Sequence, residues 1–345
     1  MFRITRMAWA RPRLAGSAPP RSSDAATLLA VLMLGGCALA PSLAQSSDQS
    51  IQWGANGHND RPDSGPNYAY NRVSLAEQMR LLTGAGLTWY RTGCSGSSCG
   101  ALPATAKAHG VKLLWGLERW PDAHADEHAN YRGAFDYAAE IARRYRGQID
   151  YFEASNEVDV WVGMNGDGSD PSQYDRERYV RARGLIKGLI DGIHAGNPSA
   201  KVLVDDAGWC HYGFLRMLWN DGIRWDITAF HWYAKQGSFE QAGCNKANVA
   251  EIHASFGLPV WITEFNSDIG AKANDQPASA AWVSAVMAQI RDVAPKYSIQ
   301  AAFVYELLDE PNLTGAERYF GIADENGQPK ATYRAIGAAL TQAQP

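Results

Sequence analysis

Short apolar runs alternate with longer amphipathic stretches from residue 51 to the end of the chain. The apolar runs are hydrophobic throughout rather than strictly alternating, which is typical of strands buried on both faces of a parallel sheet. Eight such strands are predicted, at Ile51–Asn56, Leu87–Arg91, Val111–Gly116, Ile149–Glu153, Lys201–Asp205, Ile227–Trp232, Val260–Glu264 and Ala301–Tyr305.

The stretches between these runs carry apolar residues at helical spacing. Glycines such as Gly86 and Gly110 precede the next strand, as expected where helices end. Eight strands alternating with eight helices predict an α/β fold, a (β/α)8 TIM barrel. A doubly wound open sheet is disfavoured because no glycine-rich phosphate loop follows the first strand. The predicted helices are Ser74–Thr83, 101–109, Tyr131–Tyr145, Arg176–His194, Gly213–Asn220, Asn248–Phe256, Ala278–Val293 and Thr332–Thr341.

The first 44 residues have a different pattern. Five arginines precede an apolar stretch, Ala25–Leu34, and Ser42-Leu43-Ala44 offers a cleavage site. This arrangement predicts a secretion signal in residues 1–44 and a single domain in residues 45–345, exported to the periplasm or the extracellular space. Leu34-Gly-Gly-Cys37 also resembles a bacterial lipoprotein box, so a lipid on Cys37 that anchors the protein to the outer membrane is the alternative.

The charge of the chain narrows the classes of partner. The formal net charge is −4, and removal of residues 1–44 takes away five Arg and one Asp, which makes it −8. An acidic surface argues against nucleic-acid binding and against anionic membranes. Membrane contact is therefore expected only through a lipid on Cys37, and the sequence implies no protein partner.

Four cysteines remain after the predicted signal: Cys94, Cys99, Cys210 and Cys244. An even number in an exported chain predicts two disulfides, for which the sequence allows three pairings. Cys94 and Cys99 flank a Ser-Gly-Ser-Ser loop, so a local bridge is plausible and would leave Cys210 for Cys244. Zinc binding is the rival interpretation, but a Cys-x4-Cys without a matching second pair has poor spacing for zinc.

Polar residues gather at the C-terminal ends of the predicted strands, where the reactive groups of a barrel lie. Two of them, Glu157 and Glu264, are the most informative, because two carboxylates facing each other across a cleft can cleave a glycosidic bond. The full set is Arg91, Asn156, Glu157, Asp205, Asp206, His231, Tyr233, Glu264, Tyr305 and Glu306.

As an ordered set, these residues resemble the clan A retaining glycoside hydrolases. The matching features are Asn156-Glu157 after the fourth strand, His231-x-Tyr233 after the sixth and Glu264 closing the seventh, and Arg91 matches the arginine of the clan. The resemblance implies cleavage of a β-linked poly- or oligosaccharide, with Glu157 as acid/base and Glu264 as nucleophile. It implies no cofactor and no metal.

The resemblance also implies substrate contacts. Asn156 is placed to bind the sugar 2-hydroxyl, Tyr233 and Arg91 to keep Glu264 ionised, and His231 to orient a carboxylate or bind sugar. At the eighth strand the clan usually has a tryptophan, whereas this chain has Tyr305-Glu306. Tyr305 is expected as the sugar floor and Glu306 as a hydrogen-bond partner. This ending, with Tyr319-Phe-Gly321 beyond it, resembles the glycoside hydrolase family 39 branch.

Five tryptophans fall at or just beyond predicted strand ends, and sugar rings stack on aromatic faces. Two or three of them are expected to line the cleft, with Trp115 and Trp232 among the substrate-binding residues; anchoring in the core is the alternative. The five are Trp115, Trp120, Trp161, Trp209 and Trp232.

Three other functions are alternatives to hydrolysis. A transglycosylase would use the same fold and carboxylates, with a sugar in place of water. A non-catalytic glycan-binding barrel would lack at least one of the two carboxylates, and both are present. A metal-dependent barrel hydrolase would need a histidine cluster, and only His58 and His231 lie near strand ends.

Overall fold

Eight parallel strands close into a barrel in sequence order, with β1 paired to both β2 and β8. The structure is a computed structural model, and it describes residues 50–342 except 62–64, 66 and 95–97. The predicted secretion signal and Cys37 lie outside the described residues. The predicted barrel is confirmed, and its strands are β1 Gln52–Asn56, β2 Trp89–Thr92, β3 Lys112–Gly116, β4 Tyr151–Glu153, β5 Lys201–Val204, β6 Ile227–Tyr233, β7 Val260–Asn266 and β8 Ile299–Val304.

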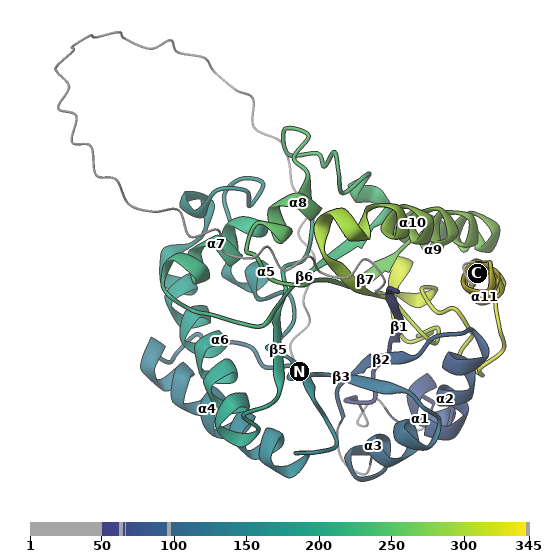
Figure 1. The fold of residues 1–345 in the computed structure, drawn as a ribbon, viewed down its shortest axis with the longest axis horizontal. Coiled ribbons are helices and arrows are strands. Elements are labelled where there is room, and N and C mark those ends of the chain that lie inside the picture. The colour runs from purple at the N-terminus through teal and green to yellow at the C-terminus, as the bar shows by residue number, and fades with distance from the viewer. Residues whose placement is uncertain (1–49, 62–64, 66, 95–97, 343–345) are drawn as a thin grey trace, which may run out of the picture. The chain divides into compact units, whose positions relative to one another are not determined.

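Helices surround the barrel on its outside (Figure 1). Each predicted helix is present, and short helices directly after β1, β4 and β7 add to them. The α-helices are α1 Ala69–Arg72, α2 Leu75–Gly84, α3 Ser98–Ala108, α4 Glu127–Arg144, α5 Val158–Val162, α6 Arg176–Gly196, α7 Tyr212–Asn220, α8 Val249–Ala254, α9 Asp268–Ala273, α10 Gln276–Tyr297 and α11 Ala331–Thr341. The 3-10 helices are η2 Pro171–Gln173, η3 Ala234–Gln236 and η4 Gly315–Arg318.

A row of four glycines on α6 allows it to pack closely against α4. They recur every four residues and so share one helix face. A Cβ at any of the four would lie only 2.3–2.5 Å from a backbone oxygen of α4. Side chains at these positions would push the two helices apart. The glycines are Gly184, Gly188, Gly192 and Gly196.

An apolar floor fills the lower interior of the barrel. The ring of Trp89 packs edge-on against Trp261, with ring centroids 5.2 Å apart, and against Phe303. Leu114, Leu203, Ile227, Ala229 and Ala301 complete this buried cluster. Because side chains alternate between the two faces of a strand, the next inward position lies two residues further along, above this floor. On β7 the step from Trp261 to Glu264 is three residues, because the register with β8 shifts there. The polar residues of the site begin above the floor.

Two disulfides are present in the described residues, Cys94–Cys99 and Cys210–Cys244. This confirms the prediction of two bridges and decides between the three pairings. Disulfides of this kind are typical of exported proteins. None of the helices among the described residues is long and apolar enough to span a membrane.

The two bridges should contribute unequally to stability. Cys210→Ser should lower the free energy of unfolding by about 3–4 kcal/mol, since the residues bridged are 34 apart in sequence. Cys94→Ser should cost less, about 2 kcal/mol, because the separation is only 5. Urea unfolding followed by circular dichroism measures both losses. Equal losses would contradict a contribution that depends on loop length.

Candidate active site

The chain turns sharply after β4 and so directs Glu157 toward the barrel axis. Ser155 has φ 73° and Glu157 has φ 47°, both in the left-handed region that non-glycine residues rarely adopt. Each such residue costs on the order of 1–2 kcal/mol, which the surrounding contacts must offset. The Ser155 hydroxyl donates to the Arg119 carbonyl, and the Glu157 backbone N–H donates to Asp205 at 3.3 Å. Strained backbone at this position fixes the direction of the Glu157 side chain.

Glu264 lies on β7, where the register with β6 shifts between Phe230 and His231. Its Oε1 accepts from Arg91 Nη1 at 2.6 Å, and its Oε2 accepts from the Tyr233 hydroxyl at 2.5 Å. The Glu264 side chain is only 8% exposed. Two charge-assisted or hydroxyl donors therefore fix the orientation of the Glu264 carboxylate.

Arg91 on β2 is buried and forms hydrogen bonds with residues of β1, β4, the segment after β4, and β7. Its Nε donates to Glu153 at 2.5 Å, and its Nη1 donates to Asn56 at 2.7 Å as well as to Glu264. Its Nη2 donates to Asn156 at 2.6 Å. Burial lowers the pKa of Arg91, but the neighbouring carboxylates of Glu153, Glu264 and Asp205 outweigh it and raise that pKa well above its usual value. The predicted place of Arg91 beside Glu264 is therefore observed.

Glu153, on β4, is a site residue that the sequence reasoning missed. It is 1% exposed and points into the barrel beside Arg91. Burial raises the pKa of Glu153 to about 7, and the charge of Arg91 opposes the rise. A usable signal was present in the sequence, because a charged residue at the end of an otherwise apolar strand run needs a buried partner.

His231 stands among three carboxylates. Its Nδ1 lies 2.9 Å from Glu157 and 3.4 Å from Glu264, and its Nε2 lies 3.1 Å from Asp205. Burial lowers the pKa of His231, but Glu264, Asp205 and Glu157 outweigh it and raise the pKa well above 6.5. Burial raises the pKa of Glu157, but the hydrogen bond and charge of His231 lower it below its usual value. The two shifts favour a proton on His231 over one on Glu157.

The two adjacent aspartates after β5 have separate surroundings. Asp205 faces His231, and burial raises the pKa of Asp205 although His231 and Arg91 oppose the rise. Asp206 accepts from the Gly208 backbone N–H at 2.9 Å and lies 2.9 Å from His253 Nε2. Asp205 thus belongs to the polar cluster, whereas Asp206 holds the loop that follows.

Tyr305 and Glu306 follow β8, and both are buried. The ring of Tyr305 packs against Tyr233 and Phe320, and its hydroxyl lies 3.1 Å from His58 Nε2. Glu306 accepts from the Tyr70 hydroxyl at 2.6 Å. Burial and the nearby Glu310 raise the pKa of Glu306 well above its usual value. Tyr305 therefore lies on the Glu264 side of the site, through its contact with Tyr233, while Glu306 lies beneath the surface.

The prediction that Trp115 and Trp232 bind substrate is wrong. Both are in the hydrophobic core, at 2% and 1% exposure. Trp115 packs on Tyr145 with ring centroids 4.7 Å apart, and Trp232 Nε1 donates to the Gly237 carbonyl at 2.8 Å. The reason is strand alternation: His231 points inward, so the next residue must point outward toward the helices.

Two other tryptophans are exposed on connections at the carboxyl ends of the strands. Trp120 follows β3 and is 45% exposed, and Trp209 follows β5 and is 41% exposed. Trp161 on α5 is partly buried and lies against the Arg178 guanidinium. Trp120 and Trp209 are therefore the aromatic faces most available to a ligand among the five.

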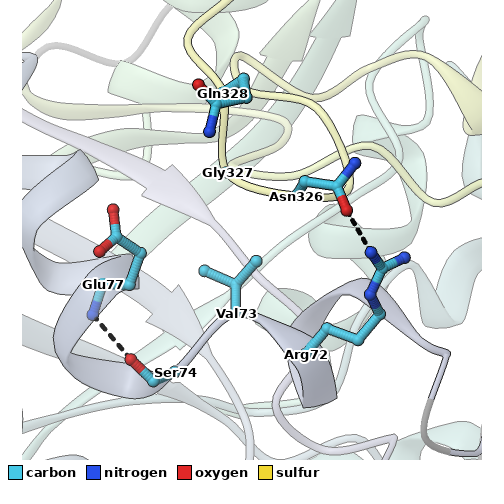
Figure 2. A pocket seen from close by; sticks show the side chains of 7 residues that line it. All are labelled: Arg72, Val73, Ser74, Glu77, Asn326, Gly327 and Gln328. Carbon is cyan, nitrogen blue, oxygen red and sulfur yellow. Dashed lines mark hydrogen bonds between the residues drawn. The ribbon is translucent and has the colours of Figure 1, made fainter.

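Of two pockets in the structure, one lies away from the predicted site residues and the other is lined by some of them. Figure 2 shows one of about 480 Å³ between the end of α1, the start of α2 and residues 326–328, where Arg72 donates to Asn326. It contains none of the predicted site residues. The other, about 10 Å³, is lined by both Arg91 and Asn156 and extends to His58 and Glu118.

Four groups of side chains in the described residues bring three potential metal ligands within 4.8 Å of one another. Two contain His231 and belong to the carboxylate cluster around it, where Arg91 and His231 already supply positive charge. The other two contain His58. In the group of Glu157, His231 and Glu264, an oxygen of each glutamate lies within this 4.8 Å limit.

Comparison with known proteins agrees with the fold. A family profile described as "Glycosyl hydrolase catalytic core" matches residues 191–329, less than half of the chain. A family 39 glycoside hydrolase from Bacteroides cellulosilyticus WH2 superposes with a TM-score of 0.62 at 14% identity, covering 84% of this chain and 63% of its own. The chain thus spans less than two thirds of that protein. No curated protein matches the sequence.

Two further structures are similar. A family 5, subfamily 18 glycoside hydrolase from Streptomyces cattleya, in complex with GlcNAc, has a TM-score of 0.64 at 15% identity and covers 87% of this chain and 82% of its own. Xylanase 10B from Thermotoga petrophila RKU-1, in complex with xylobiose, has a TM-score of 0.58 at 13% identity and covers 85% and 94%. At these identities the similarity establishes the fold, a barrel shared with clan A glycoside hydrolases.

Removing the Arg91 guanidinium should strongly destabilise the protein. Arg91→Met leaves Glu153 and Glu264 buried without their cation, and a broken buried ion pair costs about 3–5 kcal/mol. Urea unfolding at pH 7 measures the loss. In the Arg91→Met background, Glu153→Gln should recover part of it by removing one uncompensated charge. A double variant less stable than Arg91→Met alone would contradict this account.

Proposed function

We propose that this protein is a retaining glycoside hydrolase with Glu157 as acid/base and Glu264 as nucleophile. The observation that carries the proposal is that carboxylate oxygens of the two residues lie within 4.8 Å of each other across the top of the barrel. Retaining enzymes hold their carboxyls about 5–5.5 Å apart, whereas inverting enzymes leave about 6.5–9.5 Å for a water molecule. The partial match to the glycosyl hydrolase catalytic core supports the same reaction class.

The two glutamates have surroundings suited to different roles. Glu264 is buried, and the hydrogen bonds from Arg91 and Tyr233 hold its carboxylate in position for attack on the anomeric carbon. Glu157 is about one-third exposed, so its carboxyl can reach the leaving oxygen. Attack by Glu264 forms a glycosyl ester as Glu157 protonates the departing oxygen. Glu157 then removes a proton from water, which attacks the ester and releases the sugar with retained configuration.

The Glu157–His231 pair supplies the proton. Before reaction the pair holds one proton, which resides on His231 at 2.9 Å from Glu157. This proton passes through Glu157 to the leaving oxygen, and the pair regains one from water in the second step. The charge of Glu264 is the largest influence that raises the pKa of His231. Once Glu264 is esterified that charge is gone, so His231 no longer competes for the proton as strongly.

The substrate we propose is a β-linked poly- or oligosaccharide. Arg91 holds the Asn156 side-chain oxygen at 2.6 Å, which leaves the amide nitrogen to bind a sugar hydroxyl. Tyr305, packed against Tyr233, is the proposed sugar floor. Trp120 and Trp209, on the connections after β3 and β5, take the stacking role first expected of Trp115 and Trp232. Binding of GlcNAc and xylobiose by the similar barrels is consistent with this class of ligand.

We also propose that the protein acts outside the cytoplasm. Two disulfides support export. Residues 1–44 would direct export to the periplasm or the extracellular space, and a lipid on Cys37 is the alternative that anchors the protein to the outer membrane.

Substitution of each glutamate should have a different kinetic signature. Glu264→Gln should remove nearly all turnover of any β-glycoside. Glu157→Gln should slow hydrolysis of natural glycans by on the order of 10²–10⁴-fold, but affect aryl glycosides with good leaving groups much less, since these need no protonation. Proton NMR of the first product should show the β-anomer. The exposed Glu140→Gln on α4 is the matched control.

The assignment fails if Glu157→Gln leaves turnover of the natural glycan intact. It also fails if the first product is the α-anomer, which would indicate inversion. Binding of glycans without turnover in the unmodified protein would instead support a non-catalytic glycan-binding barrel.

The pH profile should report the proton on the Glu157–His231 pair. Because the pKa of His231 is raised above 6.5, the pair keeps its proton as the pH rises through neutrality. The alkaline limb of kcat/KM should therefore lie above pH 6.5. His231→Asn should move that limb to lower pH by about one unit or more, because Glu157 alone must then hold the proton.

The exposed His128→Ala is the control and should leave the profile unchanged. If the alkaline limb of kcat/KM does not move in His231→Asn, the proposal that Glu157 and His231 share a proton is wrong. The catalytic roles of Glu157 and Glu264 are tested separately, by the glutamate substitutions above.

A further inference from the structure

His58 lies on the connection after β1, outside the carboxylate cluster around His231, and is almost fully buried at 7% exposure. Its Nε2 is engaged, at 3.1 Å from the Tyr305 hydroxyl and 3.5 Å from Glu306. Its Nδ1 is buried and has no hydrogen-bond partner among the described residues. When Nε2 carries the hydrogen, Nδ1 presents a lone pair.

The group that faces this nitrogen is another acceptor. Asp60 Oδ1 lies 3.9 Å from His58 Nδ1, too far for a hydrogen bond, and this oxygen too is buried with no hydrogen-bond partner in the described part of the chain. Two buried acceptors directed at each other repel unless a positive or donating group lies between them. Glu118, two residues after the end of β3, completes the group, with ligand atoms of all three residues within 4.8 Å of one another.

The local backbone is shaped to bring these connections together. A Cβ on Gly93, after β2, would lie 3.1 Å from the Asp60 Cβ and 3.3 Å from the Gly116 carbonyl oxygen. Glycine at this position therefore allows the β1 and β3 connections to approach across β2. His58 and Glu118 line the same cavity of about 10 Å³ as Arg91 and Asn156, a space for one ion or water molecule rather than a sugar ring.

The competing group of His58, Glu306 and Glu310 has its ligand atoms largely engaged, although Glu306 Oε1 is buried without a hydrogen-bond partner among the described residues. Glu310 accepts from Tyr68 and pairs with Arg61 at 3.3 Å, and Glu306 accepts from Tyr70. In contrast, His58 Nδ1 and Asp60 Oδ1 are both free to coordinate. One imidazole nitrogen with two carboxylates suits borderline transition-metal ions, whereas Ca²⁺ and Mg²⁺ prefer oxygen ligands alone.

We propose that His58, Asp60 and Glu118 bind one divalent transition-metal ion of the Mn²⁺ or Zn²⁺ class. Ligands of such an ion at about 2.1 Å lie about 3–4 Å from one another, so the side chains need to move by on the order of 1 Å. Glu118 is exposed and Asp60 partly so, and both can adjust. The ion links the β1 and β3 connections beside Arg91 and Asn156. This site is independent of the proposed hydrolysis, since none of its ligands is Glu157 or Glu264.

Metal binding to the full-length protein tests the proposal. After EDTA treatment and dialysis, isothermal titration with MnCl₂ or ZnCl₂ should show one saturable site per chain, and CaCl₂ should bind more weakly. Asp60→Asn and Glu118→Gln, at a partly exposed and an exposed position, should each weaken binding by about tenfold or more. His58→Ala should abolish it. Circular dichroism checks that each variant is folded.

His128→Ala removes an exposed histidine on α4 and should bind the ion as the unmodified protein does. Mn²⁺ electron paramagnetic resonance should show a bound-ion spectrum that Asp60→Asn loses. Absence of saturable binding, or equal binding by Asp60→Asn, would overturn the proposal. A metal-independent rise in KM in Asp60→Asn and Glu118→Gln would overturn it in favour of direct contact with sugar hydroxyls.

Discussion

The buried guanidinium of Arg91 is the interaction on which the candidate site depends. It binds Asn56 of β1, Glu153 of β4, Asn156 beyond β4 and Glu264 of β7, at 2.5–2.7 Å. A rigid planar group with several donors fixes all these strand ends in one arrangement. The apolar floor of Trp89, Trp261 and Phe303 lies below and keeps that end of the barrel interior nonpolar. Because this surrounding is nonpolar, ion pairs of Arg91 above it are strong, and removing one partner of such a pair destabilises the protein.

The charge balance of this cluster explains why it can hold protons. Four carboxyl groups, Glu153, Glu157, Asp205 and Glu264, surround two cations, Arg91 and His231. Burial raises the pKa values of Glu153 and Asp205, and the carboxylates raise the pKa of His231. Such a group titrates as a unit rather than as separate residues. The acid/base chemistry proposed for Glu157 therefore draws on a shared supply of protons, not on one isolated carboxyl.

Much of the fold was predictable, because a buried parallel strand and an amphipathic helix each leave a periodic pattern. All eight predicted strands and all eight predicted helices lie within a few residues of their predicted positions. Arg91, Asn156, Glu157, His231 and Glu264 gather as expected, since strand ends in a barrel share one rim. The short α5 was not predicted, because its position depends on the left-handed turn at Glu157. Trp115 and Trp232 lie in the core instead of the cleft because each follows an inward residue on its strand and so points outward.

The sequence by itself determined the barrel, the set of polar strand ends and the number of disulfides. These follow from local periodicity, from residue type and from the even number of cysteines. Only the tertiary structure decided that Glu153 joins Arg91 and that His231 lies beside Glu157. Contacts and pKa values of this kind arise from burial and from charges brought together across more than 60 residues, which no local pattern records.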